Sequence, residues 1–274
     1  MTIIFGLVLT IGFSTIGLFS TINYIMHKHM FVPQIQNHEL IDKIKQHDNI
    51  QIYNILNMVT HQNINFYVIP SPNPNNKKWI VFSHGNVADI YKYYLYARHL
   101  ASETGANCLF YDYPGYGMSD GTPTSTSCVN TLSDVINGMT TSMKISRDDI
   151  YLMGQSIGTG VVVKFAYDNN WKNPIILISP YESVLRIFPG FIPYITDIFD
   201  KYPSIEYVEK LDCPIKIFHG TSDSVIKISH SFALEKKMKN KTFSLTQLQN
   251  IGHNDILENI NSIDIVNVLN FKHN

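Results

Sequence analysis

The sequence predicts an α/β fold, in which a mostly parallel sheet of eight strands carries helices on both faces. Short apolar runs alternate with longer segments of helical periodicity from about residue 50 to the end of the chain, and this alternation is typical of parallel sheets. The chain has 274 residues, 45% hydrophobic and 16% charged, which is enough for one large packed domain. We expect that domain over residues 49–274.

The expected strands begin with an early pair, IQIYNILNMV and INFYVIP, followed by a turn rich in Pro and Asn, SPNPNNKK. Six further apolar runs are predicted to be strands: residues 79–83, 107–113, 149–154, 174–180, 214–220 and 242–248. Segments of helix length follow the strands, at about residues 88–104, 125–143, 157–170, 229–239 and 255–272. Five of the six later strands are thus followed by a segment of helix length, as expected for a mostly parallel sheet.

One connection is too long to be a simple loop. It runs from Pro180 to Pro214, is rich in aromatic residues and is interrupted by three prolines. Loops longer than about 12–15 residues in a compact domain usually have a function or a structure of their own. We expect a small lid over about residues 181–212.

The first 26 residues contain no charged side chain, and about 20 apolar residues suffice for a helix to cross a bilayer. We therefore expect a single-pass transmembrane anchor at residues 1–26 and a polar connector at 27–48. A removed signal peptide, which usually begins with basic residues, and a buried hydrophobic helix are the alternatives. Lys28 after the apolar run favours a cytosolic position for the large domain, whereas a glycosylation triplet at Asn240 favours the opposite side.

Charge and cysteine content restrict the possible partners. The 21 Lys and Arg nearly balance the 22 Asp and Glu, and no basic cluster is present that would neutralise a phosphate backbone, so we expect no nucleic acid partner. Cys108, Cys128 and Cys213 lack the C-x-x-C spacing of a zinc or redox site. We expect them to be buried free thiols.

The candidate nucleophile is Ser156, in the stretch Gly154-Gln155-Ser156-Ile157-Gly158 between an expected strand and an expected helix. This G-x-S-x-G pattern is typical of a nucleophile elbow, in which a tight turn exposes the serine. The flanking positions must be glycine because a Cβ there would strike the neighbouring strand or helix. A Gly-Ser turn is also a common structural device, so the pattern needs support from an acid and a base.

Asp223 and His253 are the candidate acid and base. Asp223 follows the strand at residues 214–220, at the sheet edge where catalytic groups gather, although a turn or helix-cap role is the alternative. His253 follows the last strand, in a loop that can lean over the serine. Asp255 and Asp264 are poorer acids, because one begins the last expected helix and the other lies inside it. The chain order Ser, Asp, His is the order that this fold requires.

The stretch FSHGN follows the strand at residues 79–83. Acyl transfer builds negative charge on a carbonyl oxygen, which backbone N–H groups stabilise. We expect one such donor from the amide of Ile157 and the second from Asn86 or near it. We interpret His84 and His219, each before a glycine, as packing or turn residues. His84 would border the site and His219 would prepare the loop of the acid.

Five motifs in this order, SHGN, YDYPGYGMSDG, GQSIGTG, HGTSDSVIKISH and GHNDIL, resemble the Bem46-like branch of the α/β-hydrolase superfamily, close to the membrane-associated protein depalmitoylases. The resemblance covers about residue 60 to the end of the chain. It implies a triad of Ser156, Asp223 and His253 and esterase or thioesterase activity on long acyl chains. The depalmitoylases attach to membranes through a cluster of lipidated cysteines at the amino terminus, where this chain has an apolar segment instead.

We therefore expect a serine hydrolase that works through an acyl-enzyme and requires no metal or cofactor. An acylated small molecule or a lipidated protein would be its substrate, and Phe188, Phe191 and Ile192 in the lid would contact the acyl chain or the membrane. A cap that simply packs on the core is the alternative for those three residues. A general carboxylesterase or lipase, an amidase or peptidase, and an inactive membrane-tethered scaffold are the rival functions.

Overall fold

The computed structural model describes residues 30–33, 39, 41–42, 44, 52–56, 62–187 and 202–272. The chain divides into two compact units, Met1–Val32 and Pro33–Asn274, and the fold below is that of the second unit. No helix within the described ranges is both long and apolar enough to cross a membrane. The expected anchor at residues 1–26 lies outside those ranges.

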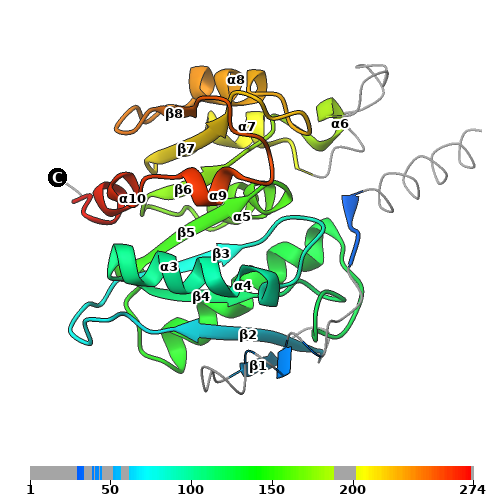
Figure 1. Ribbon diagram of the computed structural model, residues 1–274, viewed down its shortest axis with the longest axis vertical. Coiled ribbons are helices and arrows are strands. Elements are labelled where there is room, and N and C mark those ends of the chain that lie inside the picture. The colour runs from blue at the N-terminus through cyan, green and yellow to red at the C-terminus, as the bar shows by residue number, and fades with distance from the viewer. Residues whose placement is uncertain are drawn as a thin grey trace, which may run out of the picture. The chain divides into compact units, whose positions relative to one another are not determined.

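The described residues form one eight-stranded sheet, with the strands stacked from β1 to β8 in the spatial order β1-β2-β4-β3-β5-β6-β7-β8 (Figure 1). β2 is antiparallel to both β1 and β4, and the other neighbouring pairs are parallel. The prediction of a mostly parallel eight-stranded sheet is confirmed. The strands are β1 Ile52–Leu56, β2 Asn63–Ile69, β3 Trp79–Ser83, β4 Asn107–Tyr111, β5 Ile150–Gln155, β6 Ile175–Ile178, β7 Ile215–Gly220 and β8 Leu245–Leu248.

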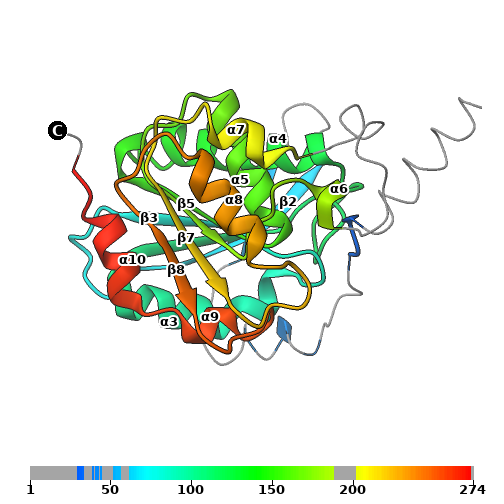
Figure 2. The same cartoon turned by 90° about the horizontal axis from the view of Figure 1, so that it is seen from above.

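Helices cover both faces of the sheet, as expected. α4, α5, α7 and α8 lie on one face and α3, α9 and α10 on the other (Figure 2). The helices are α3 Tyr94–Thr104, preceded by the 3₁₀ turn η1 Ile90–Tyr93, α4 Ser125–Thr141, α5 Ile157–Asp168, α6 Val184–Ile187, α7 Ser204–Val208, α8 Ser229–Lys237, α9 Ile256–Asn259 and α10 Ser262–Leu269, with a second 3₁₀ turn, η2 Arg147–Asp149, before β5.

The central strands are buried on both faces. Every residue of β5, β6 and β7 is buried, because helices cover both sides of a parallel sheet and each strand can then be a continuous apolar run. On the α3 side, the rings of Phe82 and Phe110 stack with centroids 4.6 Å apart. This rigid centre holds the carboxyl ends of β3, β5 and β7 in fixed positions, and the candidate site residues follow these ends.

The helix expected at residues 255–272 is instead two helices. α9 ends at Asn259, and Asn261 caps the start of α10 by accepting a 3.0 Å hydrogen bond from the amide of Ile263 through its Oδ1. Asn is a strong helix-capping residue, so this capping bond favours a new helix start over the continuation of the first.

The lid remains a prediction. α6 and α7 lie within residues 181–212, but Phe188, Phe191 and Ile192 lie outside the described residues. The three cysteines are buried and unpaired, as expected.

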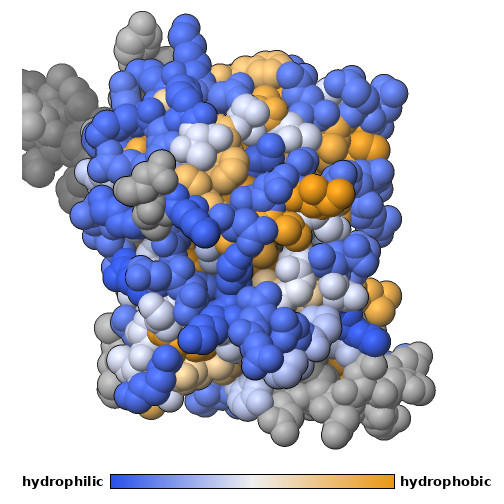
Figure 3. Space-filling model, turned by 90° about the vertical axis from the view of Figure 1, so that its left-hand side faces the viewer, coloured by the Kyte–Doolittle hydropathy of each residue, from blue (hydrophilic) through white to orange (hydrophobic). Residues whose placement is uncertain are grey.

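The face of the molecule toward the amino ends of the parallel strands is mainly hydrophilic (Figure 3). Hydrophobic side chains are interspersed among the hydrophilic ones there. The candidate site residues lie at the opposite ends of the strands.

Candidate active site

Ser156 occupies a tight turn between β5 and α5. Its φ is +52° and its ψ is −120°, a left-handed backbone conformation that costs free energy for a residue with a side chain. The turn is held on both sides, since the amide of Ser156 donates to the carbonyl of Ile178 at 2.9 Å and its own carbonyl accepts from the amide of Thr159 at 3.0 Å. The serine side chain is thereby presented at the carboxyl edge of the sheet.

The two glycines that flank the serine are required by close backbone contacts. A Cβ on Gly154 would lie 2.5 Å from the carbonyl oxygen of Gly158, and a Cβ on Gly158 would collide with the carbonyl of Ser83. These distances are shorter than any van der Waals contact. The structure thus supplies the steric reason that the sequence pattern predicts.

The structure brings the three predicted triad residues together. His253 Nε2 lies 3.1 Å from Ser156 Oγ, and His253 Nδ1 lies 2.7 Å from Asp223 Oδ2. A carboxylate only accepts, so Nδ1 donates to Asp223, and in the neutral imidazole Nε2 is left to accept from the serine hydroxyl. The structure pairs His253 with Asp223 rather than with Asp255 or Asp264, which lie at the starts of α9 and α10.

Asp223 is held by its own turn. Its Oδ1 accepts hydrogen bonds from the amides of Val225 at 2.9 Å and Ile226 at 2.8 Å. Burial raises the pKa of this carboxyl, but hydrogen bonds from His219, His253 and the Ile226 amide outweigh the burial and bring the pKa well below its usual range. The group is therefore a carboxylate at neutral pH, and its Oδ2 can accept the hydrogen of His253 Nδ1.

The loop after β3 lies directly beside the nucleophile. A Cβ placed on Gly85 would be 3.7 Å from the Cβ of Ser156. On the other side of Ser156, Ile157 is the first residue of α5, and the first amides of a helix have no carbonyl within the helix to donate to. The two expected backbone donors, at Ile157 and Asn86, thus belong to segments adjacent to Ser156.

Three tyrosines fix this loop, and sequence reasoning missed them. Tyr113 OH donates to the carbonyl of His84 at 2.8 Å, and Tyr116 OH donates to Asn86 Oδ1 at 2.9 Å. Tyr93 OH accepts from the amide of Gly85 at 3.2 Å. The repeated tyrosines of YDYPGYG were the available signal for two of them, but nothing in the pattern identifies their partners.

His84 completes the support of the loop. The side chain is fully buried, and its Nδ1 donates to the carbonyl of Gly85 at 2.7 Å. That carbonyl shares its peptide unit with the amide of Asn86, so the imidazole orients the N–H that we expect to be a donor. Burial lowers the pKa of His84 to about 4, and the imidazole is neutral at pH 7. Its Nε2 lies 3.4 Å from Asp112 Oδ1.

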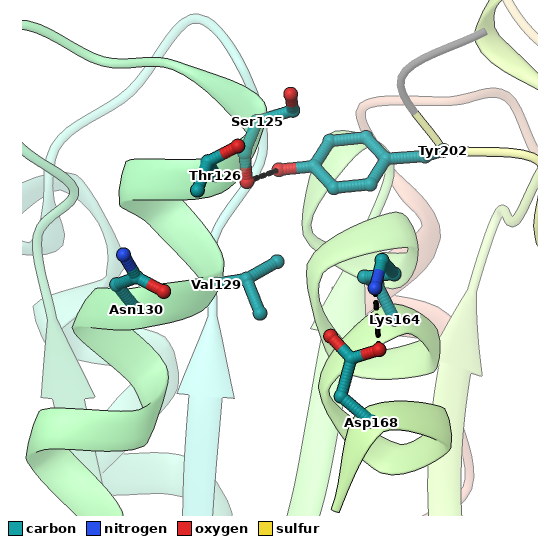
Figure 4. A pocket seen from close by; sticks show the side chains of 7 residues that line it. All are labelled: Ser125, Thr126, Val129, Asn130, Lys164, Asp168 and Tyr202. Atoms are coloured by element: carbon teal, nitrogen blue, oxygen red, sulfur yellow. Dashed lines mark hydrogen bonds and ion pairs between the residues drawn. The ribbon is translucent and has the colours of Figure 1, made fainter.

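A hollow of about 120 Å³ lies between α4 and α5, away from these residues. Figure 4 shows Val129 on α4 extending toward Lys164 on α5, and Asn130 and Asp168 also line the hollow. Lys164 is paired with Asp168, and Tyr202 OH donates to the carbonyl of Ser125 at 2.9 Å. Ser156, Asp223, His253, Ile157 and Asn86 are not among the described residues that line this hollow.

Comparison with known proteins gives consistent matches. The family model described as serine aminopeptidase, S33, matches residues 74–205. A protein of Acanthamoeba polyphaga mimivirus that is named as an α/β hydrolase is 36% identical over 203 residues, which are 74% of this chain and 76% of that protein. The alpha/beta hydrolase domain-containing protein 17C of Mus musculus is 34% identical over 184 residues, 67% of this chain but only 56% of its own length.

Solved structures share the fold at low sequence identity. An esterase of Pyrococcus furiosus superposes with a TM-score of 0.66 at 15% identity, over 87% of this chain and 96% of the other. Est1E of Butyrivibrio proteoclasticus with bound ferulic acid gives a TM-score of 0.63 at 21% identity, over 79% and 96% of the two chains. The viral α/β hydrolase is 36% identical to this chain over 74% of its residues. This chain therefore belongs to the α/β-hydrolase superfamily.

Proposed function

We propose that this protein is a serine hydrolase that cleaves ester or thioester bonds through an acyl-enzyme intermediate. The observation that carries the proposal is the line of two hydrogen bonds from Ser156 through His253 to Asp223, at 3.1 and 2.7 Å. A serine hydroxyl is a weak nucleophile on its own, and an adjacent base that is oriented by a third group activates it. The left-handed backbone of Ser156 is consistent with the strain stored at such turns.

In the first step, Ser156 Oγ attacks the carbonyl carbon of the substrate and His253 Nε2 takes the hydroxyl proton. The Asp223 carboxylate keeps the imidazole in the tautomer that can accept this proton and stabilises the imidazolium that forms. The imidazolium then gives the proton to the departing alkoxide or thiolate, and the C–O or C–S bond breaks to leave an acyl-serine. In the second step His253 takes a proton from a water molecule that attacks the ester carbonyl, and it returns this proton to Ser156 Oγ as the bond from Oγ to the acyl carbon breaks, which releases the acid and the free serine.

The negative charge on the carbonyl oxygen needs fixed donors. We assign the backbone N–H groups of Ile157 and Asn86 to this role. The support is the position of their segments beside Ser156 and the rigid tethering of the loop after β3 by His84 and the tyrosines. Donors of this kind are preorganised and lose little free energy when charge develops, and one of them typically accounts for about 10²–10³ in kcat.

Fatty-acyl thioesters of proteins are the substrate class that the motif resemblance to the depalmitoylases favours. The names of two structural neighbours, an esterase and a monoacylglycerol lipase, support oxygen esters as the alternative. The description of the matching family model as a serine aminopeptidase favours a peptide substrate as a second candidate. All three substrates share the attack on a carbonyl by Ser156 and differ in the leaving group.

The apolar stretch at residues 1–26 would attach the enzyme to a membrane, with the hydrolase domain in the cytosol. Its lack of charged side chains supports this proposal. The full chain should sediment with membranes and resist alkaline carbonate, whereas a chain that begins near residue 45 should not. Release of the full chain by carbonate would contradict a transmembrane anchor.

The decisive test of the proposed function is Ser156→Ala. This variant should lose labelling by a fluorophosphonate probe and hydrolysis of a p-nitrophenyl ester, because no other group replaces the attacking oxygen. Ser125→Ala is the matched control, since Ser125 lines the hollow between α4 and α5, and this variant should keep both activities. Continued turnover by folded Ser156→Ala would exclude the acyl-serine mechanism, and absence of labelling in folded wild-type protein would favour an inactive scaffold.

A substrate profile then separates the three substrate classes. The purified domain would be offered acyl thioesters, oxygen esters of the same chain lengths and aminoacyl anilides. A depalmitoylase should prefer long-chain thioesters at least tenfold in kcat/KM over the matched oxygen esters. Preference for the oxygen esters would favour a general esterase or lipase, and preference for the anilides would favour a peptidase.

A further inference from the structure

A second histidine, His219, also lies close to the carboxylate of Asp223. His219 lies near the end of β7, and its side chain is fully buried. Its Nδ1 lies 2.6 Å from Ser231 Oγ on α8, and its Nε2 lies 2.8 Å from the carbonyl oxygen of Ile226. Both nitrogens therefore have partners.

The partners determine the tautomer of His219. A carbonyl oxygen only accepts, so Nε2 carries the hydrogen and donates to Ile226, and Nδ1 then accepts from the hydroxyl of Ser231. The amide of the same residue, Ile226, donates to Asp223 Oδ1. His219 thus binds the far end of the turn that holds the carboxylate.

The same Nε2–H also faces the carboxylate directly. His219 Nε2 lies 3.4 Å from Asp223 Oδ2, which is the oxygen that accepts from His253 Nδ1 at 2.7 Å. One oxygen therefore receives a short hydrogen bond from the base and a longer contact from a second imidazole. Both contacts are to Asp223 Oδ2. The positively polarised N–H of His219 near this oxygen therefore weakens the attraction between the carboxylate and His253.

We propose that His219 is a positioning residue for the hydrolytic reaction: its Nε2–H fixes the turn of Asp223 and moderates how strongly the shared carboxylate oxygen acts on His253. This inference rests on the proposed function and assigns a role in it to a residue outside the triad. His219 does not touch the substrate in this role. It acts only through Asp223.

Other charged groups near His219 belong to neighbouring elements. His230 lies on α8 beside Ser231, and its Nδ1 is 3.2 Å from Glu182 Oε1 in the loop after β6. Asp223 and His253 come from the loops after β7 and β8. A shift in the pH profile is therefore assigned to His219 only if replacement of a neighbouring buried side chain does not cause the same shift.

The test compares two replacements of similar length at this position. His219→Gln keeps an N–H near the place of Nε2, and His219→Met fills the space without a donor. His219→Met should lower kcat/KM about tenfold, mainly through kcat, and should move the acid limb of the pH profile of kcat/KM upward by roughly half a pH unit. The direction follows because a carboxylate oxygen that loses a donor attracts the imidazolium of His253 more strongly. His219→Gln should keep the limb at the wild-type position and recover most of the rate.

Ile217→Ala is the control for simple loss of packing, because Ile217 is a fully buried residue of the same strand. It should reduce the melting temperature without moving the acid limb. If His219→Met and His219→Gln have the same pH profile as the wild type, the proposal is wrong. If His219→Met does not fold, His219→Leu takes its place with the same expected shift. Failure of the wild-type enzyme to react with the fluorophosphonate would instead reject the proposed function itself.

Discussion

The two sides of Ser156 are held by different chemistry. On the side of the base, hydrogen bonds join Ser156 to His253 and His253 to Asp223, and a second imidazole, that of His219, lies 3.4 Å from the same carboxylate oxygen. On the side of the loop after β3, neutral groups hold the backbone: tyrosine hydroxyls and a histidine whose pKa burial lowers to about 4. In the reaction proposed above, the imidazole of His253 changes its charge, whereas the loop after β3 presents fixed N–H groups. Replacing a charge on the first side should therefore cost far more activity than removing a neutral hydrogen bond on the second.

Asp223→Asn should have the largest effect. The carboxamide donates through its nitrogen and cannot hold His253 in the tautomer that accepts from Ser156, so kcat should fall by about 10⁴-fold. Steady-state hydrolysis of a p-nitrophenyl ester at pH 7 measures the loss. Asp255→Asn is the matched control, since Asp255 lies just beyond His253 at the start of α9, and it should change kcat less than threefold. Equal losses in the two variants would contradict the assignment of the acid.

The second effect is the pH dependence of the free energy of unfolding that His84, in the loop after β3, should cause. Burial lowers the pKa of His84 to about 4, below its ordinary value of about 6.5. The unfolded chain therefore binds a proton more readily than the folded protein as the pH falls from 6.5 toward 4, and the free energy of unfolding decreases over that window. The loss should be on the order of 3 kcal/mol, because each unit of difference in pKa between the folded and the unfolded chain corresponds to about 1.4 kcal/mol.

Urea unfolding of wild type and His84→Asn at pH 7 and pH 4.5 tests this expectation. The variant has no group that titrates at this position and should lose less stability between the two pH values. Parallel losses in both proteins would show that His84 does not contribute to the acid sensitivity of the fold.

Tyr113→Phe should have a smaller effect. It removes a hydrogen bond from a tyrosine hydroxyl to a backbone carbonyl near Ser156, and a control variant removes the same kind of bond far from Ser156. The variant leaves the carbonyl of His84 without its hydroxyl donor and should cost about 1–2 kcal/mol of unfolding free energy. Tyr151→Phe is the matched control, because Tyr151 OH donates to the carbonyl of Leu269 at 2.8 Å, at the opposite end of the sheet from Ser156. Both variants should lose similar stability by urea unfolding, but only Tyr113→Phe should lower kcat, by a few-fold. A similar kcat loss in Tyr151→Phe would mean that the loop after β3 has no special role.

The sequence predicted the fold well because hydrophobic periodicity and glycine positions are local signals. Eight apolar runs became eight strands, and the glycines around Ser156 have the steric function that the pattern suggests. The break in the last helix was missed because a polar Asn261 in an otherwise helical pattern fits both one continuous helix and two helices. Only the hydrogen bond from the amide of Ile263 to the side chain of Asn261 distinguishes them.

Within the site, the candidate triad could be predicted because chain order and strand ends restrict the choice. Parallel strands place their carboxyl ends at one edge, so Asp223 and His253 could be selected from many Asp and His residues by position alone. The supporting groups were not predictable in the same way. The hydroxyl of Tyr113 contacts a backbone carbonyl 29 residues away in the chain, and a backbone carbonyl has no sequence signature.

The smallest expected effect lies in the hollow between α4 and α5. Lys164 and Asp168 form an i,i+4 ion pair whose side chains are 30% and 38% exposed, and exposed helix pairs contribute about 0.3–0.5 kcal/mol. Lys164→Ala should therefore lower the melting temperature by no more than Lys237→Ala, which removes the exposed pair between Lys237 at the end of α8 and Glu209 directly after α7. Neither variant should change kcat or KM, because Ser156, His253 and Asp223 are not among the described residues that line this hollow. A fall in kcat confined to Lys164→Ala would show that the active site extends to this hollow. A third region with a charged side chain would then contribute to the reaction, besides the two sides of Ser156.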